Sequence, residues 1–185
     1  MTGTTGTAKA LLVDDRRDNL TALAALLQGL QVETVAVTSG EEALKQLLVD
    51  DFAVILLDAQ MPDMDGFETA SHIKRRERTR HIPIIFLTAA DRDAQLALRG
   101  YAAGAVDYLT KPFDPWVLRA KVSVFVDLWT KNRMLETQAA IVREREEQRA
   151  ALTDAIDRAL AALRGSDGVR DVGQAIEILE RARYG

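Results

Sequence analysis

Short apolar runs alternate with helical patterns between Lys9 and about Val126, and this alternation constrains the fold more than any other feature. Each run consists mainly of leucine and β-branched residues, which is typical of strands covered on both faces. Five segments fit this description: Ala10–Val13, Thr34–Val37, Ala53–Leu57, Ile82–Leu87 and, more weakly, Val106–Leu109. Strands of this kind belong to a parallel sheet, so the pattern predicts an α/β domain.

The segments between these runs carry apolar residues at three- and four-residue spacing, as amphipathic helices do. Ser39 and Glu42 form a capping box at the start of one of them, where their side chains pair with free N–H groups. Two expected helices have apolar faces, one made of Leu20, Leu23, Leu27 and Leu30 and the other of Ala43, Leu44, Leu47 and Leu48. Two more are expected over Gly66 to about Glu77 and over Arg92 to about Ala103. The fold expected is a doubly wound, five-stranded parallel sheet whose strand C-terminal ends share one edge.

A second pattern begins at Pro115, because no glycine and no further proline occurs before Leu163. One continuous helix of roughly 75 Å is therefore expected. An apolar row recurs every seven residues and consists of Leu128, Leu135, Val142, Ile156 and Leu163, with Arg149 interrupting it. The companion row is partly polar at Asn132, Glu146 and Thr153. This heptad predicts a coiled coil of modest stability and a parallel homodimer.

The alternative for this helix is a monomer in which it bends back near the charged stretch Arg143–Arg149. Seven cations stand against six anions between Lys131 and Arg164, so the helix is no basic arm for nucleic acid. A helix breaker follows at Arg164–Gly168, and then a short helix over about Val172 to Ala182. The expected organisation is a disordered N-terminus at 1–7, the α/β domain at 8–127, a coiled-coil helix at 128–164 that continues the last domain helix, and the breaker with a short helix at 165–185.

Composition excludes several classes of protein. A net charge of −4 argues against a mainly basic nucleic-acid binder, and the lack of cysteine excludes disulfides, thiolate zinc sites and a thiol nucleophile. The only histidines, His72 and His81, are too few for an imidazole-rich metal site. No run of about 18 apolar residues occurs and Met1–Lys9 is small and polar, so we expect a cytoplasmic protein without membrane span or signal peptide.

Polar residues follow four of the predicted strands at their C-terminal ends. Asp14 and Asp15 follow the first strand and Asp58 the third, while Thr88 follows the fourth and Lys111 the fifth. Each residue alone has a plain structural explanation, such as a helix cap or a solvated turn residue. Because the topology brings all of them to one edge of the sheet, their combination favours a site.

The chemistry of such a site follows from its charges. Three carboxylates at one edge repel each other by about 4 kcal/mol per pair at 4 Å and an effective dielectric of 20. A hard divalent cation relieves the repulsion, and carboxylates with a backbone carbonyl suit Mg²⁺. A lysine and a threonine neutralise and hydrogen-bond phosphoryl oxygens. One carboxylate is then able to act as the nucleophile that forms an aspartyl phosphate.

The motif order DD, DxxMPxMDG, TA and KP resembles the receiver domain of bacterial two-component response regulators, over about residues 8–130. The resemblance implies that Asp58 is the phosphoacceptor and that Asp14 and Asp15 support Mg²⁺, or Mn²⁺ in its place, with Asp15 the more direct ligand. It implies that the backbone carbonyl of Gln60 completes the protein's metal ligands. By the same resemblance Thr88 and Lys111 bind phosphoryl oxygens and Tyr108 is the aromatic switch residue.

The resemblance also implies a flavodoxin-like sheet with strand order 2-1-3-4-5 and a cis peptide bond before Pro112. The implied partner is a histidine kinase or a phosphotransfer protein. The chain is then a signalling domain that catalyses only its own phosphorylation and dephosphorylation, and no enzyme in the usual sense. We interpret Asp65 and Gly66 only as loop-shaping residues, with the glycine tolerating positive φ.

Other functions fit the sequence less well. A haloacid-dehalogenase-type phosphatase also uses an aspartyl nucleophile with Mg²⁺, but it needs D-x-D after the first strand, and here Asp14 is followed by Asp15 and Arg16. The P-loop and dinucleotide-binding glycine motifs are missing. The output stays open between two hypotheses. One is a stand-alone regulator that dimerises and binds a protein partner through its helical arm. The other is the N-terminal receiver and linker of a longer protein with an effector such as a histidine kinase, cyclase or phosphatase.

Overall fold

The computed structural model of this chain describes residues 6–89, 107–164 and 175–180. The chain divides into two compact units, residues 1–133 and 134–185. The first unit contains a parallel sheet of five strands: β1 (Ala8–Val13), β2 (Val32–Val37), β3 (Val54–Asp58), β4 (Ile84–Ala89) and β5 (Asp107–Lys111). The strand order is β2-β1-β3-β4-β5, which confirms the expected flavodoxin-like topology.

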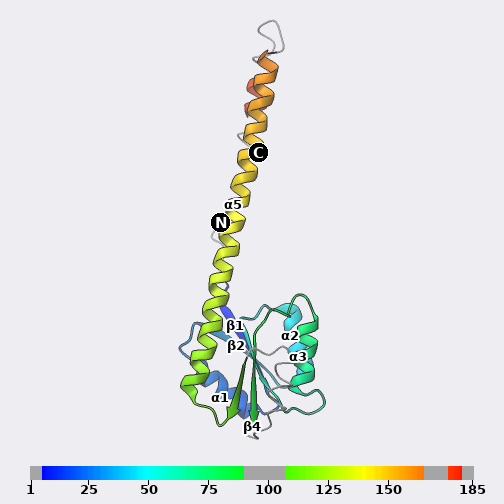
Figure 1. Cartoon of the computed structure of the whole chain (residues 1–185), viewed down its shortest axis with the longest axis vertical. Coiled ribbons are helices and arrows are strands. Elements are labelled where there is room, and N and C mark those ends of the chain that lie inside the picture. Colours follow the sequence, from blue (N-terminus) through cyan, green and yellow to red (C-terminus); the bar gives the residue numbers. More distant parts are fainter. Residues whose placement is uncertain (1–5, 90–106, 165–174, 181–185) are drawn as a thin grey trace. The chain divides into compact units, whose positions relative to one another are not determined.

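Helices cover both faces of this sheet (Figure 1). The helix α1 (Arg17–Leu27) and the first part of α5 (Pro115–Arg164) pack on one face, where Leu23 and Leu118 join the core. The helices α2 (Gly40–Val49) and α3 (Gly66–Arg75) pack on the other face through Leu47 and Ile73. The central strands β1 and β3 are almost wholly buried, as their apolar runs predicted.

Helix caps agree with the sequence in part. The Ser39 hydroxyl accepts a hydrogen bond from the backbone N–H of Glu42 at 3.2 Å, which confirms this N-cap. The Glu42 carboxylate instead accepts bonds from the N–H and hydroxyl of Thr38, one residue earlier than a capping box requires. These bonds lower the pKa of Glu42. Asp65 caps α3, since its carboxylate accepts from the N–H of Glu68 at 2.7 Å.

Three details differ from the sequence prediction or lie beyond its test. The first helix ends at Leu27 and so excludes Leu30, because Gly29 takes a φ of 83° and turns the chain. The fourth and fifth strands begin and end later than the predicted runs, since they cover Ile84–Ala89 and Asp107–Lys111. The helix expected over 92–103 lies outside the described residues. The peptide bond before Pro112 is cis, as expected.

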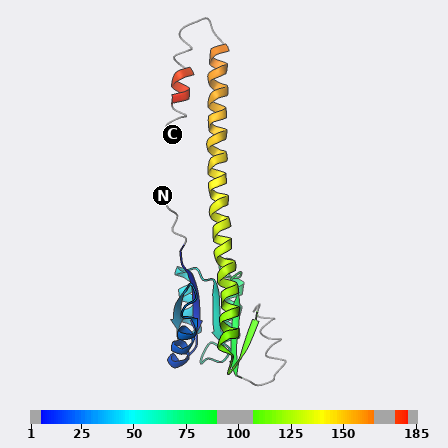
Figure 2. The same cartoon turned by 90° about the vertical axis from the view of Figure 1, so that its left-hand side faces the viewer.

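The second unit contains the continuation of α5 and a short helix at residues 175–180. α5 reaches Arg164 without a break, so the bend considered near Arg143–Arg149 does not occur in the helix. The short helix lies beside the distal part of α5 (Figure 2), and Ala155, Ala159 and Ala175 are buried there. Within the described ranges, no helix has the length and apolarity that crossing a membrane demands.

Candidate functional site

The C-terminal edge of the sheet gathers the polar residues that the sequence placed at strand ends. Asp14 directly follows β1, Asp58 is the last residue of β3 and Lys111 is the last residue of β5. Thr88 lies near the end of β4, opposite Thr110 in the ladder between β4 and β5. Parallel register therefore places these residues on one edge, although β5 is separated from β3 by β4.

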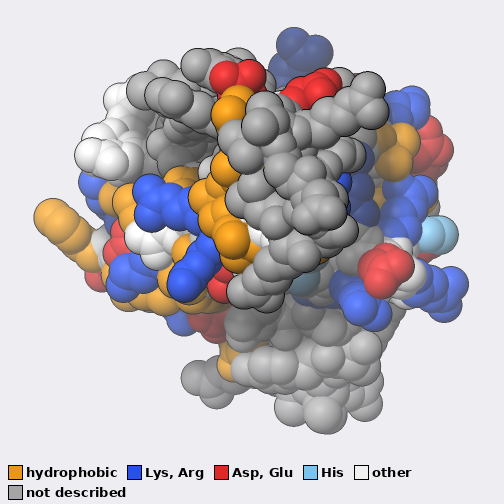
Figure 3. Space-filling model, turned by 90° about the horizontal axis from the view of Figure 1, so that it is seen from above, with side chains coloured by type: hydrophobic (Ala, Val, Ile, Leu, Met, Phe, Trp, Pro, Cys, Tyr) orange, Lys and Arg blue, Asp and Glu red, His pale blue; other side chains and the backbone are white. Residues whose placement is uncertain are grey.

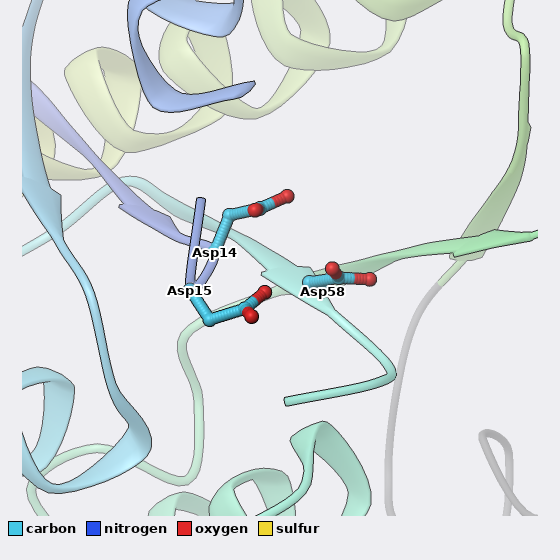
Figure 4. Close-up of side chains that lie close together, drawn as sticks. All are labelled: Asp14, Asp15 and Asp58. Carbon is cyan, nitrogen blue, oxygen red and sulfur yellow. The ribbon is translucent and has the colours of Figure 1, made fainter. Parts of the chain in front are cut away.

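Three carboxylates form the centre of this edge. Asp14, Asp15 and Asp58 each place a carboxylate oxygen within 4.8 Å of the others. Figure 4 shows Asp14 and Asp15 together at the end of β1 and Asp58 at the end of β3. Asp14 and Asp58 are buried, whereas Asp15 is exposed to solvent. The cluster thus combines a protected interior with one carboxylate that solutes reach freely.

Lys111 supplies the positive charge of the cluster. Its Nζ lies 3.0 Å from Oδ2 of Asp14 and 3.2 Å from Oδ2 of Asp58. Burial raises the pKa of Asp58, and the charge of Lys111 offsets part of this rise. Burial acts to lower the pKa of Lys111, but the hydrogen bond to Asp14 and the charge of Asp58 outweigh it, so that pKa is raised. The lysine therefore stays charged at neutral pH.

Asn19 is a site residue that the sequence reasoning missed. It lies in the first turn of α1, and its side-chain amide is 2.8 Å from Oδ1 and 3.0 Å from Oδ2 of Asp14. The backbone N–H of Arg16 also donates to Oδ1 of Asp14, at 3.0 Å. Its position was the only clue in the sequence. When a helix begins directly after a strand, a side chain five residues after Asp14 lies close to the end of that strand.

Gln60 and Thr88 lie at the same edge of the sheet, whereas Tyr108 is the second residue of β5 and lies farther from that edge. The backbone N–H of Gln60 lies 3.5 Å from Oδ1 of Asp58, which folds the loop after β3 back toward the carboxylate. Thr88 is buried, and its hydroxyl donates to the carbonyl of Ala89 at 3.3 Å. Tyr108 lies on β5 and is 45% exposed. Its ring is therefore accessible at the surface.

Gly66 has a different role from the one expected of it. A Cβ atom built on Gly66 would lie 2.2 Å from the backbone oxygen of Asp58. Among described glycines only Gly29 has positive φ, so backbone freedom is not the reason for a glycine at position 66. The loop after β3 instead packs directly on the backbone that carries Asp58, and any side chain at position 66 would displace it.

The residues of the cluster fit a hard divalent cation. Carboxylate oxygens are the ligands that Mg²⁺ prefers, and one exposed carboxylate leaves room for the waters that this ion retains. Three close carboxylates facing a single lysine also leave net negative charge for a cation to neutralise. Among the described residues, no second cluster of this kind occurs.

The two histidines do not belong to this site. His81 is exposed, and Nε2 of His72 lies 3.9 Å from a carboxylate oxygen of Glu68 on the same helix. Both flank a segment that contains Lys74, Arg75, Arg76, Arg78 and Arg80. In the space-filling view, Lys and Arg side chains gather near histidine on the surface (Figure 3). His81 is exposed and His72 is partly exposed, so both histidines lie at the surface.

A five-stranded parallel sheet of this order, with an acidic cluster and a lysine at its C-terminal edge, defines a signalling domain of the receiver type. The family described as response regulator receiver domain matches residues 10–123. The chain belongs to the response regulator receiver domain family of two-component systems. Members of this class are signalling domains and not enzymes in the usual sense.

Relatives and solved structures agree with this family. The chain is 37% identical over 164 residues to a probable cyclic di-GMP phosphodiesterase of Vibrio cholerae, covering 83% of this chain and 35% of that protein. It is 39% identical to the response regulator PleD of Caulobacter vibrioides, over 62% of this chain and 25% of PleD. The structure of the Vibrio cholerae chemotaxis protein CheY4 matches with a TM-score of 0.60 and 30% identity, over 65% of this chain and 99% of CheY4. The chain thus spans about a third or less of the length of these two curated relatives.

Proposed function

We propose that this chain accepts a phosphoryl group on Asp58 from a histidine kinase or a phosphotransfer protein and passes the signal to its helical arm. The observation that carries the proposal is the bridge made by Lys111, whose Nζ contacts Asp58 and Asp14 within a cluster of three carboxylates. A buried carboxylate beside a fixed cation has the charge balance that a phosphoryl acceptor needs.

The residues proposed to hold Mg²⁺ are Asp15, Asp58 and the backbone carbonyl of Gln60, with Asp14 supporting them. When bound, the ion neutralises charge that develops on the transferred phosphoryl group. The exposure of Asp15 supports its assignment as the more direct ligand of the acidic pair. Asp14 is the less direct ligand, since its oxygens already accept hydrogen bonds from Asn19, Lys111 and the N–H of Arg16.

The proposed transfer uses the remaining residues at the sheet edge. A carboxylate oxygen of Asp58 attacks phosphorus, and the bond from phosphorus to the donor's histidine nitrogen breaks as the new bond forms. Lys111 then pairs with one phosphoryl oxygen and the Thr88 hydroxyl donates to another. Tyr108 is the proposed switch residue, because it lies three residues before Lys111 on β5. Only the chain's own phosphorylation and dephosphorylation are catalysed.

Phosphorylation in vitro tests the proposal directly. Incubation with acetyl phosphate and Mg²⁺ should add one phosphoryl mass to the chain, and Asp58→Ala or EDTA should prevent the addition. Asp63→Asn is the matched control, because Asp63 lies in the same loop but is exposed. Labelling that survives in Asp58→Ala contradicts the assignment of the phosphoacceptor.

The proposed output surface is the apolar row on α5, which would form a parallel homodimer. In the described part of the row, Leu128, Leu135, Val142 and Ile156 are 42–63% exposed; the side chain of Leu163 lies outside the described set. Pairing two copies would remove these side chains from water, at about 25 cal/mol for each Å² buried. The polar positions Asn132, Glu146 and Thr153 weaken the pairing, which suits a switch between states of similar energy.

A second candidate is the N-terminal receiver and linker of a longer protein. Similarity to the Vibrio cholerae phosphodiesterase extends over 164 residues, beyond the receiver match at 10–123, while that relative is much longer than this chain. The helix α5 would then connect the receiver to an effector domain. Reading the gene beyond the codon for Gly185 decides between the candidates, since an effector domain in the same frame would favour the second.

A further inference from the structure

The carboxylate of Asp14 is the most completely paired group in the cluster. It is 0% exposed, and each of its oxygens accepts two hydrogen bonds. Oδ1 accepts from the backbone N–H of Arg16 and from the amide of Asn19, and Oδ2 accepts from the same amide and from Nζ of Lys111. Among the residues that the structure describes, Asn19 is therefore the only one whose side chain donates to both oxygens.

Lys111 contacts two carboxylates, Asp14 and Asp58. Its Nζ lies 3.0 Å from Asp14 and 3.2 Å from Asp58. Under the proposed function, on which this inference rests, the lysine turns away from Asp14 toward a phosphoryl group on Asp58. If Lys111 were the only donor to Oδ2 of Asp14, its departure would leave a buried carboxylate oxygen without a hydrogen bond. The equilibrium constant for that movement would then be roughly tenfold lower or more.

We infer that Asn19 is a positioning residue that frees Lys111 for the phosphoryl group. Its amide keeps both oxygens of Asp14 hydrogen-bonded after the lysine has left, so the movement leaves no buried acceptor unpaired. The first turn of α1 fixes Asn19 beside the end of β1, and the residue needs no movement of its own. Asn19 thus acts through Lys111 and touches neither Asp58 nor the phosphoryl group.

A cavity of about 260 Å³ adjoins these residues and makes a conservative test possible. Asp14, Asn19, Ala22 and Lys111 are among the residues that line it. The space admits one extra methylene group, so a glutamine at position 19 is able to present its amide to Asp14. The variant Asn19→Leu has nearly the shape of asparagine but donates no hydrogen bond.

The first experiment is a double-mutant cycle on the full chain in EDTA, which requires neither Mg²⁺ nor phosphorylation. Urea unfolding is measured for Asn19→Leu, Lys111→Ala and the double variant. Each single variant leaves both oxygens of Asp14 with a donor, whereas the double variant leaves Oδ2 with none. The double variant is expected to lose about tenfold more in the folding equilibrium constant than the product of the single losses. If the loss in the double variant lies within twofold of the product of the two single losses, the inference is overturned.

The second experiment measures phosphorylation by acetyl phosphate at saturating Mg²⁺. Asn19→Leu is expected to slow phosphorylation about tenfold, whereas Asn19→Gln should keep most of the wild-type rate. In a chain that already carries Lys111→Ala, adding Asn19→Leu should not slow phosphorylation further. Ala22→Leu, at a residue that lines the same cavity, leaves all hydrogen bonds to Asp14 in place; it is the control and should keep the wild-type rate. A wild-type rate in Asn19→Leu overturns the inference alone, whereas a wild-type chain that takes up no phosphoryl group overturns the proposed function.

Discussion

Lys111 forms an ion pair with Asp58, with 3.2 Å between Nζ and Oδ2, although β4 separates the strands that carry the two residues. The lysine reaches across the end of β4 and brings β5 into the acidic site. Because α5 follows β5 after a short connection, this contact joins the proposed phosphoacceptor to the element that begins the helical arm. A change in charge at Asp58 would therefore act first on Lys111.

Lys111→Ala is expected to permit phosphorylation of Asp58, slowed at least as much as in Asn19→Leu, but to uncouple the phosphorylated state from β5 and α5. The lysine is a point charge that binds the phosphoryl group. Its loss therefore weakens the coupling between Asp58 and β5 more than it weakens phosphoryl transfer itself. Hydrogen exchange over Asp107–Val126 should change on phosphorylation in the wild type and stay unchanged in the variant. Equal responses of the two proteins would refute this role.

Asp58→Asn is expected to stabilise the metal-free fold at neutral pH. Burial raises the pKa of Asp58 above its unfolded value, so the folded state favours the protonated form. The stability that this carboxyl contributes is fully present below its unfolded pKa of about 4 and is lost as the pH rises through the folded pKa.

The gain from Asp58→Asn should therefore appear at pH 7 and disappear toward pH 4. In thermal unfolding with EDTA, each kcal/mol gained corresponds to about 2–4 °C for a chain of this size. Asp63→Asn, at an exposed carboxylate of the same loop, should leave the unfolding temperature unchanged at both pH values. A gain from Asp58→Asn that persists undiminished at pH 4 would show that the buried charge is not its cause.

Mg²⁺ is expected to raise the unfolding temperature of the wild type, because a ligand that binds only the folded state stabilises it. At a Mg²⁺ concentration 100 times the dissociation constant the gain is about 2.7 kcal/mol. Asp15→Asn should remove most of this gain. Asp18→Asn, an exposed carboxylate in the first turn of α1, should retain it. A full gain in Asp15→Asn would remove Asp15 from the proposed ligands.

Gly66→Ala is expected to damage the site through the backbone. The added methyl group would lie 2.2 Å from the carbonyl oxygen of Asp58, so β3 and the following loop must move apart. Overpacking of this kind costs about 1–3 kcal/mol of stability, and phosphorylation should fall with it. Gly6→Ala is the control, since a methyl group there meets no atom within 4 Å. Equal urea midpoints for the two variants would contradict the close approach.

Replacing Leu135 and Ile156 with lysine is expected to give monomers while leaving phosphorylation of Asp58 intact. Both side chains belong to the exposed apolar row of α5, and a buried lysine pair would disfavour the dimer. The matched control places lysines at Ala140 and Gln148, which are exposed and lie outside that row. In sedimentation equilibrium at tens of micromolar, a monomeric wild type, with or without phosphodonor, would falsify the coiled-coil proposal.

The sequence determined the elements of this fold and the positions of its charged residues. Continuous apolar runs such as Ala53–Leu57 bury both faces and therefore define central strands, and the lack of breakers after Pro115 defines a helix that runs to Arg164. Local rules also located Asp14, Asp58 and Lys111 at strand ends, because parallel topology brings those ends to one edge.

Only the tertiary structure decided how these residues meet. Lys111 and Asp14 are 97 positions apart in the chain, and no periodicity shows that one ammonium group lies between two carboxylates. The amide of Asn19 reaches both oxygens of Asp14 because α1 begins immediately after β1, and Gly66 is glycine because the backbone of Asp58 leaves no room for a side chain. Sequence patterns record which face of an element is buried, whereas hydrogen-bond partners and close backbone contacts depend on distances that exist only after the elements have packed.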